Sequence, residues 1–366
     1  MSLPSRFATE PPFKHGQTAR TGVLFCNLGT PDAPTAPALR RYLAQFLSDP
    51  RVVEIPRWLW LMILHGIILR VRPAKSAKKY ASIWLPEGSP LKVWTERQAQ
   101  ALQALFTEHG QAVVVRYAMT YGNPSIESQL AAMKAEGVTR ILVLPAYPQY
   151  SGTTTASVFD SVHRWALSQR SVPELRFVNH YHDDPGYIRS LAAQVRQHWA
   201  ANGQGDVLVM SFHGVPERTL QLGDMYHCEC HKTARLLATE LGLKPEQYKV
   251  TFQSRFGKAK WLEPYTEASV RELGRLGTRR VDVICPGFTS DCLETLEEIA
   301  MEVKAAFMEE GGQDFHYIPC LNANADWIAA LHGVALQHAA GWPLQPADAQ
   351  ALAASRAAAL ALGARD

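Results

Sequence analysis

Short hydrophobic runs alternate with amphipathic segments along the chain. The runs are mostly apolar throughout, which is typical of parallel strands that are covered on both faces. The segments between them repeat apolar residues at helical spacing. We therefore expect eight strands, at residues 21–28, 112–118, 140–145, 174–181, 206–212, 248–253, 280–286 and 314–318. Helices are expected at residues 125–136, 154–168, 185–201, 232–243, 262–276 and 293–310.

This order of strands and helices predicts an α/β protein with parallel sheets. The strands fall into two sets of four, which indicates two similar doubly wound, Rossmann-like domains. We expect the first domain at residues 1–180, the second at 181–322, and an Ala-rich helical tail at 323–366 that packs back on the body. A long gap between the first two strands predicts an insertion at about residues 49–91.

Composition narrows the possible functions. Of the 366 residues, 47% are hydrophobic and 19% are charged, which excludes a largely disordered chain. The net charge of +3 is too small to indicate a nucleic-acid partner. The motifs of dinucleotide-binding proteins, P-loop NTPases, zinc proteases and α/β-hydrolases are absent from the sequence. Because the first 20 residues contain no apolar secretory segment, we expect a protein of the reducing cytoplasm.

An apolar stretch from Trp58 to Leu69 lies inside the insertion. It is too short to span a bilayer. Two interpretations remain open: a buried helix, or an apolar lip that takes up a flat ligand or touches a membrane surface. Arg70 and Arg72 follow the stretch, and arginines bind carboxylates well.

Candidate catalytic groups stand after the strands of the second half. Ligands bind beyond the carboxyl ends of parallel strands, and His213 stands there. A neutral imidazole accepts a proton or ligates a metal, although a histidine at this place can also merely cap a strand. Asp291, Glu294 and Glu298 are spaced to share one helix face. First-turn acids suit the helix dipole, but three stacked acids repel each other and favour a divalent cation such as Fe²⁺ or a proton relay.

A second dense cluster runs from His227 through Cys228, Glu229 and Cys230 to His231. It has metal-binding atoms, but no second pair of cysteines completes a four-ligand site. We expect a loop before the next helix there, and a labile metal or redox role stays open.

Four stretches together resemble the ferrochelatase family. They are Leu-Phe-Cys-Asn-Leu-Gly-Thr-Pro at 24–31, Tyr-Pro-Gln-Tyr-Ser at 147–151, Ser-Phe-His-Gly-Val-Pro at 211–216, and Gly-Phe-Thr-Ser-Asp-Cys-Leu-Glu-Thr-Leu-Glu-Glu at 287–298. They occur in the family's order, and the resemblance covers about residues 20–330.

The resemblance implies a chelatase-like fold with a porphyrin cleft between two domains. It implies a lyase that inserts Fe²⁺ into protoporphyrin IX and releases two protons, the last step of haem biosynthesis. The catalytic and metal-binding residues are then His213 and Glu294, and Asp291 and Glu298 form an acidic ladder on a helix with a π-type distortion. The implied porphyrin-binding positions are Leu28, Arg72, Tyr80, Ser89, Arg116, Tyr117, Tyr147 and Ser151.

The chain departs from many relatives at Cys292, where they have a histidine. Because no cysteine follows Cys320, we expect no [2Fe–2S] cluster of the C-terminal type and no permanently bound cofactor; Fe²⁺ is a substrate. The alternatives are a coproporphyrin ferrochelatase, another divalent-metal chelatase, and a non-catalytic porphyrin or haem carrier. We expect a monomer or homodimer without nucleic acid, with peripheral contact of the Trp58–Leu69 lip at the inner membrane face.

Overall fold

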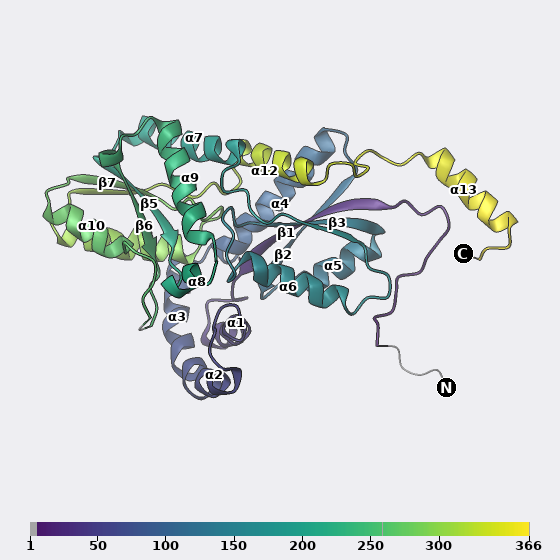
Figure 1. Cartoon of the computed structure of the whole chain (residues 1–366), viewed down its shortest axis with the longest axis horizontal. Coiled ribbons are helices and arrows are strands. Elements are labelled where there is room, and N and C mark those ends of the chain that lie inside the picture. The colour runs from purple at the N-terminus through teal and green to yellow at the C-terminus, as the bar shows by residue number, and fades with distance from the viewer. Residues whose placement is uncertain (1–5, 258, 366) are drawn as a thin grey trace.

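The computed structural model describes residues 6–257 and 259–365 and contains two parallel four-stranded sheets (Figure 1). The first has the order β2-β1-β3-β4, and the second has the order β6-β5-β7-β8. The strands are β1 (Arg20–Gly29), β2 (Val113–Tyr121), β3 (Val138–Pro145), β4 (Glu174–Phe177), β5 (Val207–His213), β6 (Tyr248–Gln253), β7 (Arg280–Ile284) and β8 (Asp314–Tyr317). All neighbouring strands pair in parallel, so the predicted α/β class with two similar sheets is confirmed.

Both sheets have the same topology, because each begins at a strand with neighbours on both sides. In the first sheet the chain runs from β1 to β2 on one side, and then to β3 and β4 on the other side. In the second sheet it runs from β5 to β6, and then to β7 and β8, in the same way. Open sheets bind ligands beyond the carboxyl ends of strands at such switch points. The ends of β1 and β3, and of β5 and β7, are therefore the places to look for chemistry.

The helices connect the strands and cover the sheets. They are α1 (Ala36–Leu47), α4 (Pro90–Glu108), α5 (Ile126–Ala135), α6 (Thr155–Ala166), α7 (Pro185–Asn202), α8 (Glu217–Gln221), α9 (Tyr226–Leu241), α10 (Thr266–Arg275) and α11 (Lys304–Glu309), with a short 3₁₀ turn at Pro245–Gln247. A π-helix, η3 (Glu294–Val303), precedes α11. The predicted loop at residues 227–231 is wrong, because α9 already begins at Tyr226.

The insertion forms α2 (Arg57–Ile63), a π-helix η1 (Leu64–Ile68) and α3 (Leu69–Ile83). Pro73 has no N–H to give to the carbonyl of Leu69, and that carbonyl instead accepts a hydrogen bond of 2.9 Å from Arg40 Nε on α1. Leu64 is buried, but Trp58 is 69% exposed and Met62 is 59% exposed. The interpretation as a fully buried helix is therefore wrong for the outer face.

The tail divides into two parts. Helix α12 (Ala325–His338) packs on α4 and α7 and buries Trp327, whose ring lies 5.9 Å from that of Tyr187. This part packs back as predicted. Helix α13 (Ala349–Ala361) has no buried residue and lies away from both sheets (Figure 1), so the prediction fails there. Among the described residues, no helix combines the length and the apolar content that crossing a bilayer requires.

Candidate active site

His213 is the last residue of β5 and is half-buried. Its Nδ1 lies 2.6 Å from the carbonyl oxygen of Gly214, which can only accept a hydrogen bond. The neutral ring therefore carries its proton on Nδ1 and leaves the Nε2 lone pair available. A Cβ at residue 214 would lie 2.7 Å from the carbonyl oxygen of Gln253, so the tight turn after the histidine requires glycine.

Glu294 and Glu298 stand on η3, beyond the end of β7. In a π-helix the hydrogen bonds close five residues apart, so a turn is wider and residues four apart stay on one face. Burial raises the pKa of Glu298, and the Glu294 carboxylate raises it further, while His213 lowers it. Glu298 therefore interacts electrostatically with both His213 and Glu294.

Asp291 does not share this face. It precedes the π-helix and is buried, where it accepts hydrogen bonds from Tyr317 Oη at 2.5 Å, Asn322 Nδ2 at 2.7 Å and the backbone N–H of Cys320 at 3.2 Å. The expected single face of three acids is wrong, because that spacing assumed a regular α-helix beginning at residue 291.

Glu302, four residues after Glu298, extends the series instead, and we call Glu294, Glu298 and Glu302 the acidic row. Lys79 of α3 lies 2.7 Å from Glu302 and 2.9 Å from Glu297, which ties the insertion to η3. Glu302 and Lys79 were not among the site residues predicted from the sequence. The spacing of four residues between Glu294, Glu298 and Glu302 could have identified Glu302. The sequence around Lys79 contains no pattern that predicts its ion pairs.

Tyr42 and Tyr80, in the first half of the chain, interact electrostatically with Glu294. Tyr42 of α1 donates to the carbonyl oxygen of Gly29 at 3.2 Å, and a hollow of about 250 Å³ opens beside it. Burial raises the pKa of both Tyr42 and Tyr80, and Glu294 contributes to both shifts. Burial likewise raises the pKa of Tyr147, with a contribution from Tyr42. These phenols therefore lie within electrostatic reach of one another or of Glu294.

Two other expected porphyrin positions, Leu28 and Arg72, lie on β1 and α3. Leu28 packs in the apolar cluster that contains Tyr80, together with Leu293. Arg72 lies with its guanidinium 4.7 Å from the ring centre of Phe256, which follows β6, and burial lowers its pKa.

Two serines among the expected porphyrin positions are buried. Ser89 stands immediately before α4. Ser151 binds Thr153 Oγ1 at 3.0 Å and Asp224 Oδ2 at 3.3 Å. The hydroxyl of Ser151 is therefore already engaged within the protein.

Arg116 and Tyr117 are not brought to the site. Strand β2 extends to Tyr121, three residues beyond the predicted end, so both residues fall in the middle of the strand. The Arg116 guanidinium pairs with Glu136 at the end of α5. Tyr117 lies beside Glu96 of α4, and burial raises its pKa to about 12.

Cys292 is buried beside Glu294. Burial, followed by the charge of Glu294, raises the pKa of the thiol well above its usual value. The thiol therefore stays protonated near neutral pH, and a protonated thiol is a poor metal ligand.

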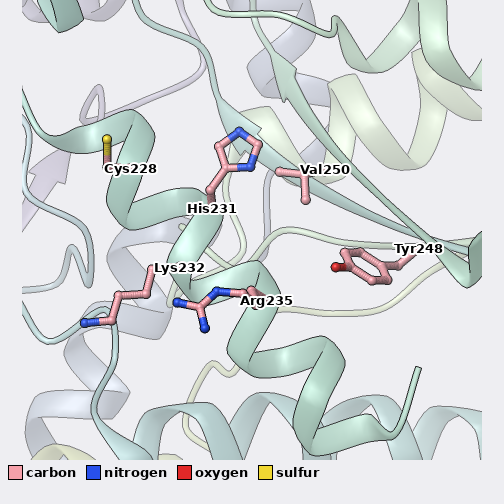
Figure 2. A pocket seen from close by; sticks show the side chains of 6 residues that line it. All are labelled: Cys228, His231, Lys232, Arg235, Tyr248 and Val250. Atoms are coloured by element: carbon pink, nitrogen blue, oxygen red, sulfur yellow. The ribbon is translucent and has the colours of Figure 1, made fainter. Parts of the chain in front are cut away.

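The His227–His231 cluster does not form one metal site. Cys228 is exposed and Cys230 is buried, since residues two apart on a helix point in different directions. The rings of His227 and His231 lie 4.5 Å apart. Figure 2 shows Cys228 and His231 on α9, where they line a hollow of about 480 Å³ with Lys232, Arg235, Tyr248 and Val250.

Comparison with known proteins agrees with the two-sheet architecture and the site motifs. The family model described as ferrochelatase matches residues 20–339. A protein named ferrochelatase from Polaromonas sp. (strain JS666) is 67% identical over 363 residues, covering 98% of this chain and 99% of that protein. Another of the same name, from Methylibium petroleiphilum, is 65% identical over 361 residues, covering 98% of this chain and 99% of that protein.

A solved structure described as SirB from Bacillus subtilis with Fe³⁺ matches with a TM-score of 0.51. It is 12% identical and covers 87% of this chain and 96% of that chain, so the likeness shows the fold alone. The family model and the near-full-length relatives carry the assignment: this chain belongs to the ferrochelatase family of metal-inserting enzymes.

Proposed function

We propose that this protein inserts Fe²⁺ into protoporphyrin IX and releases two protons, with His213 and Glu294 at the reacting centre. One observation carries this assignment. The Nδ1 of His213 is bonded to the carbonyl oxygen of Gly214, which leaves the Nε2 lone pair available. Glu298 interacts electrostatically with this ring and with Glu294. Both halves of the chain contribute groups near Glu294, since its charge also raises the pKa of Tyr42 and Tyr80 of the first half.

The chemistry requires these groups. A porphyrin holds two inner N–H groups, and a metal cannot enter until these protons leave and the ring bends. Distortion of the bound ring is supported by contacts distant from the reacting nitrogens. Among those contacts we propose Leu28, Arg72, Tyr80, Ser89, Tyr147 and Ser151. His213 Nε2 then accepts a pyrrole proton or serves as the last protein ligand of Fe²⁺, and Glu298 exchanges the ion or protons with Glu294.

The test is the loss of protoporphyrin fluorescence when Fe²⁺ is added without oxygen. We expect His213→Ala to lower turnover by at least about 100-fold, the usual contribution of a positioned acid–base group, while porphyrin still binds. Glu294→Gln should slow turnover more than Glu298→Gln. His163→Ala, which alters an exposed histidine on α6, is the matched control. Turnover of His213→Ala at the control's rate would refute the assignment.

The same assay separates the alternatives. Coproporphyrin carries more carboxylates than protoporphyrin, so faster turnover of coproporphyrin would reassign the substrate. Faster insertion of Co²⁺ or Ni²⁺ than of Fe²⁺ would indicate another metal chelatase. Binding of porphyrin without any insertion would indicate a carrier.

We also propose that the exposed apolar face of α2 and η1 touches the inner face of a membrane from the cytoplasm. Trp58, Met62 and Ile67 are exposed there, and Arg70 and Lys75 follow on α3. The pattern of exposed apolar side chains beside cations suits an interfacial contact. Wild-type protein should co-sediment with anionic vesicles more than Trp58→Ser/Met62→Ser does. Equal co-sedimentation of the wild type and the double variant would refute this membrane contact.

The domain division at residues 1–180, 181–322 and 323–366 and a monomeric or homodimeric state remain proposals. Limited proteolysis checks the division, and sedimentation analysis checks the oligomeric state. The packing of α12 on both α4 and α7 supports a tail that stays with the body when the chain is cut after α12.

A further inference from the structure

Two histidines and a glutamate that are not among the candidate active-site residues lie close together. His180 and His182 follow β4, and Glu229 lies in the first turn of α9. His180 Nδ1 is 2.7 Å from Glu229 Oε1, and His182 Nδ1 is 3.4 Å from Glu229 Oε2. One potential ligand atom from each residue lies within 4.8 Å of the other two.

The imidazole of His182 is buried, yet its Nδ1 has no hydrogen-bond partner. Nδ1 lies 3.4 Å from Glu229 Oε2 but makes no hydrogen bond with it, and Nε2 lies 3.9 Å from Asp183 Oδ2. A buried polar atom left without a partner is costly, and a cation bound between Nδ1 and the carboxylate removes the cost.

The charges around the cluster leave room for a cation. The ammonium group of Lys232 is held by Asp183 at 2.5 Å.

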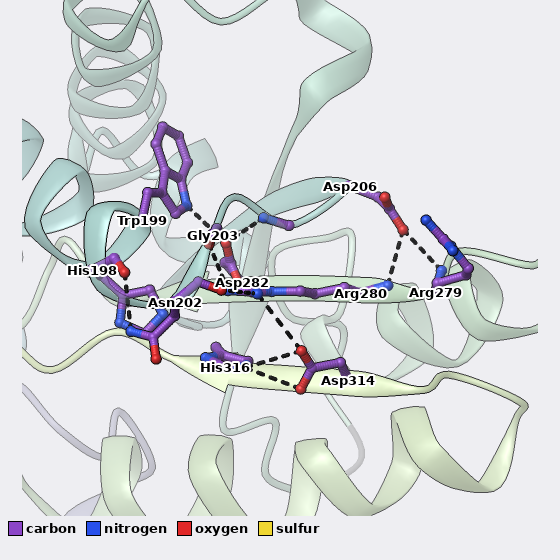
Figure 3. A network of polar contacts seen from close by, with 11 residues as sticks. His198, Trp199, Asn202, Gly203, Asp206, Arg279, Arg280, Asp282, Asp314 and His316 are labelled. Carbon is purple, nitrogen blue, oxygen red and sulfur yellow. Dashed lines mark hydrogen bonds and ion pairs between the residues drawn. The ribbon is translucent and has the colours of Figure 1, made fainter.

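A second trio of two histidines and one carboxylate differs in its charges, although its His198 Nε2 also has no hydrogen-bond partner. His198, Asp282 and His316 also lie within ligating distance of one another. Figure 3 shows the polar network around them, in which Asp282 accepts from Arg280 Nε at 3.0 Å and Trp199 Nε1 at 2.7 Å. Because a guanidinium already neutralises Asp282, this trio is a suitable control.

We propose that His180, His182 and Glu229 form a second divalent-metal site for a borderline transition ion such as Zn²⁺ or Fe²⁺. Two imidazoles and one carboxylate are a donor set that these ions accept, with further positions open to water. The side chain of His180 is 41% exposed and gives the ion a route from solvent. When the ion binds, the Nδ1 proton of His180 moves to Nε2, so no net proton is lost.

The site is connected to the segment 147–151 near the candidate active site. Glu229 Oε2 accepts a hydrogen bond of 2.7 Å from the backbone N–H of Tyr150. Asp224, just before α9, accepts another of 2.7 Å from the N–H of Gly152. An ion that fixes the Glu229 carboxylate therefore also fixes the backbone next to Tyr147 and Ser151. The ion acts as a positioning device and not as the inserted metal.

The test counts Zn²⁺ ions bound to the full-length chain by equilibrium dialysis. The starting variant is His213→Ala/Glu294→Gln, so that the candidate active site does not contribute. We expect this variant to bind one Zn²⁺ and to melt at a higher temperature with Zn²⁺ present. Adding His182→Gln should weaken binding by at least about 100-fold, because losing a ligand costs no less than losing an outer-shell partner.

Two further variants keep the test decisive. Adding His180→Gln, at the more exposed position, should weaken Zn²⁺ binding in the same way even where His182→Gln disturbs folding. Adding His198→Gln should leave both the stoichiometry and the Zn²⁺-dependent melting shift unchanged. The proposal is overturned when the starting variant binds no Zn²⁺, or when His180→Gln binds it as tightly as the starting variant does.

Discussion

The backbone N–H of Ser254 donates a hydrogen bond of 2.6 Å to one carboxylate oxygen of Glu298, and its hydroxyl donates one of 2.5 Å to the other. Ser254 follows β6 with φ at 65°, in the left-handed region that few residues other than glycine adopt. The turn after β6 therefore clamps Glu298 with two donors. This clamp holds an acidic side chain of η3 within electrostatic reach of His213 of β5.

The Ser254→Ala variant removes one donor from this clamp and keeps the backbone N–H. A hydrogen bond to a charged group is worth about 1.5–3 kcal/mol. We expect Fe²⁺ insertion to slow by about 10-fold or more, since about 1.4 kcal/mol corresponds to tenfold in rate. Ser82→Ala is the control, because that hydroxyl bonds only the backbone of α3. Equal rates for the two variants would show that the clamp does not serve the reaction.

Gln98 of α4 joins the two halves of the chain. Its Nε2 donates to the carbonyl oxygens of Thr289 at 2.7 Å and Asn322 at 2.8 Å, and the side chain is fully buried. Gln98→Met removes the donor to the Asn322 carbonyl, while the Thr289 carbonyl keeps its bond from the backbone N–H of Asn322, and we expect a loss of about 1–3 kcal/mol in the free energy of unfolding. Urea denaturation measures it. Gln100→Met, at an exposed position of the same helix, should change stability by less than about 0.5 kcal/mol.

Asp291 should behave as a structural carboxylate and not as part of the acidic row. Asp291→Asn weakens the bonds from Tyr317 and Asn322, and we expect a loss of about 2–3 kcal/mol in stability. The remaining folded enzyme should keep most of its turnover, in contrast to Glu294→Gln. Asp326→Asn, at an exposed position of α12, is the control. Loss of turnover with unchanged stability would return Asp291 to the reacting centre.

The buried His332 is expected to lower the free energy of unfolding as the pH falls. It is buried against Phe106, binds Gln111 Oε1 at 2.8 Å and stacks on His109 at 5.2 Å. Burial first, and His109 second, lower its pKa in the folded chain. The unfolded chain titrates this group near pH ~6.5 and so binds more protons below that pH. The stability contribution is complete above that pH and is lost as the pH falls through the folded pKa.

The melting temperature of His332→Gln should therefore fall less than that of the wild type between pH ~7.5 and pH ~5.5. His163→Gln, at an exposed position, should follow the wild type. A larger fall in His332→Gln would reverse the sign of the argument.

Local sequence patterns determined much of this protein. Continuous apolar runs mark the strands because both faces of each sheet are covered, and all eight predicted strands appear. Glycine after His213 and acids after β7 are visible in the sequence, because a ligand edge needs tight turns and chemical groups directly after the strands. The four family motifs carry the same information.

The tertiary structure decided the rest, since it depends on contacts between residues far apart in the chain. Strand β2 extends to Tyr121 through its pairing with β1, and this extension moves Arg116 away from the site. The π-helix sets which acids share a face, and the bonds from Tyr317 and Asn322 take Asp291 out of that row. His180 and His182 lie close to Glu229 only because the chain folds two distant segments together, since His180 and Glu229 are 49 residues apart in sequence. No pattern within either segment encodes the separation of those side chains in space.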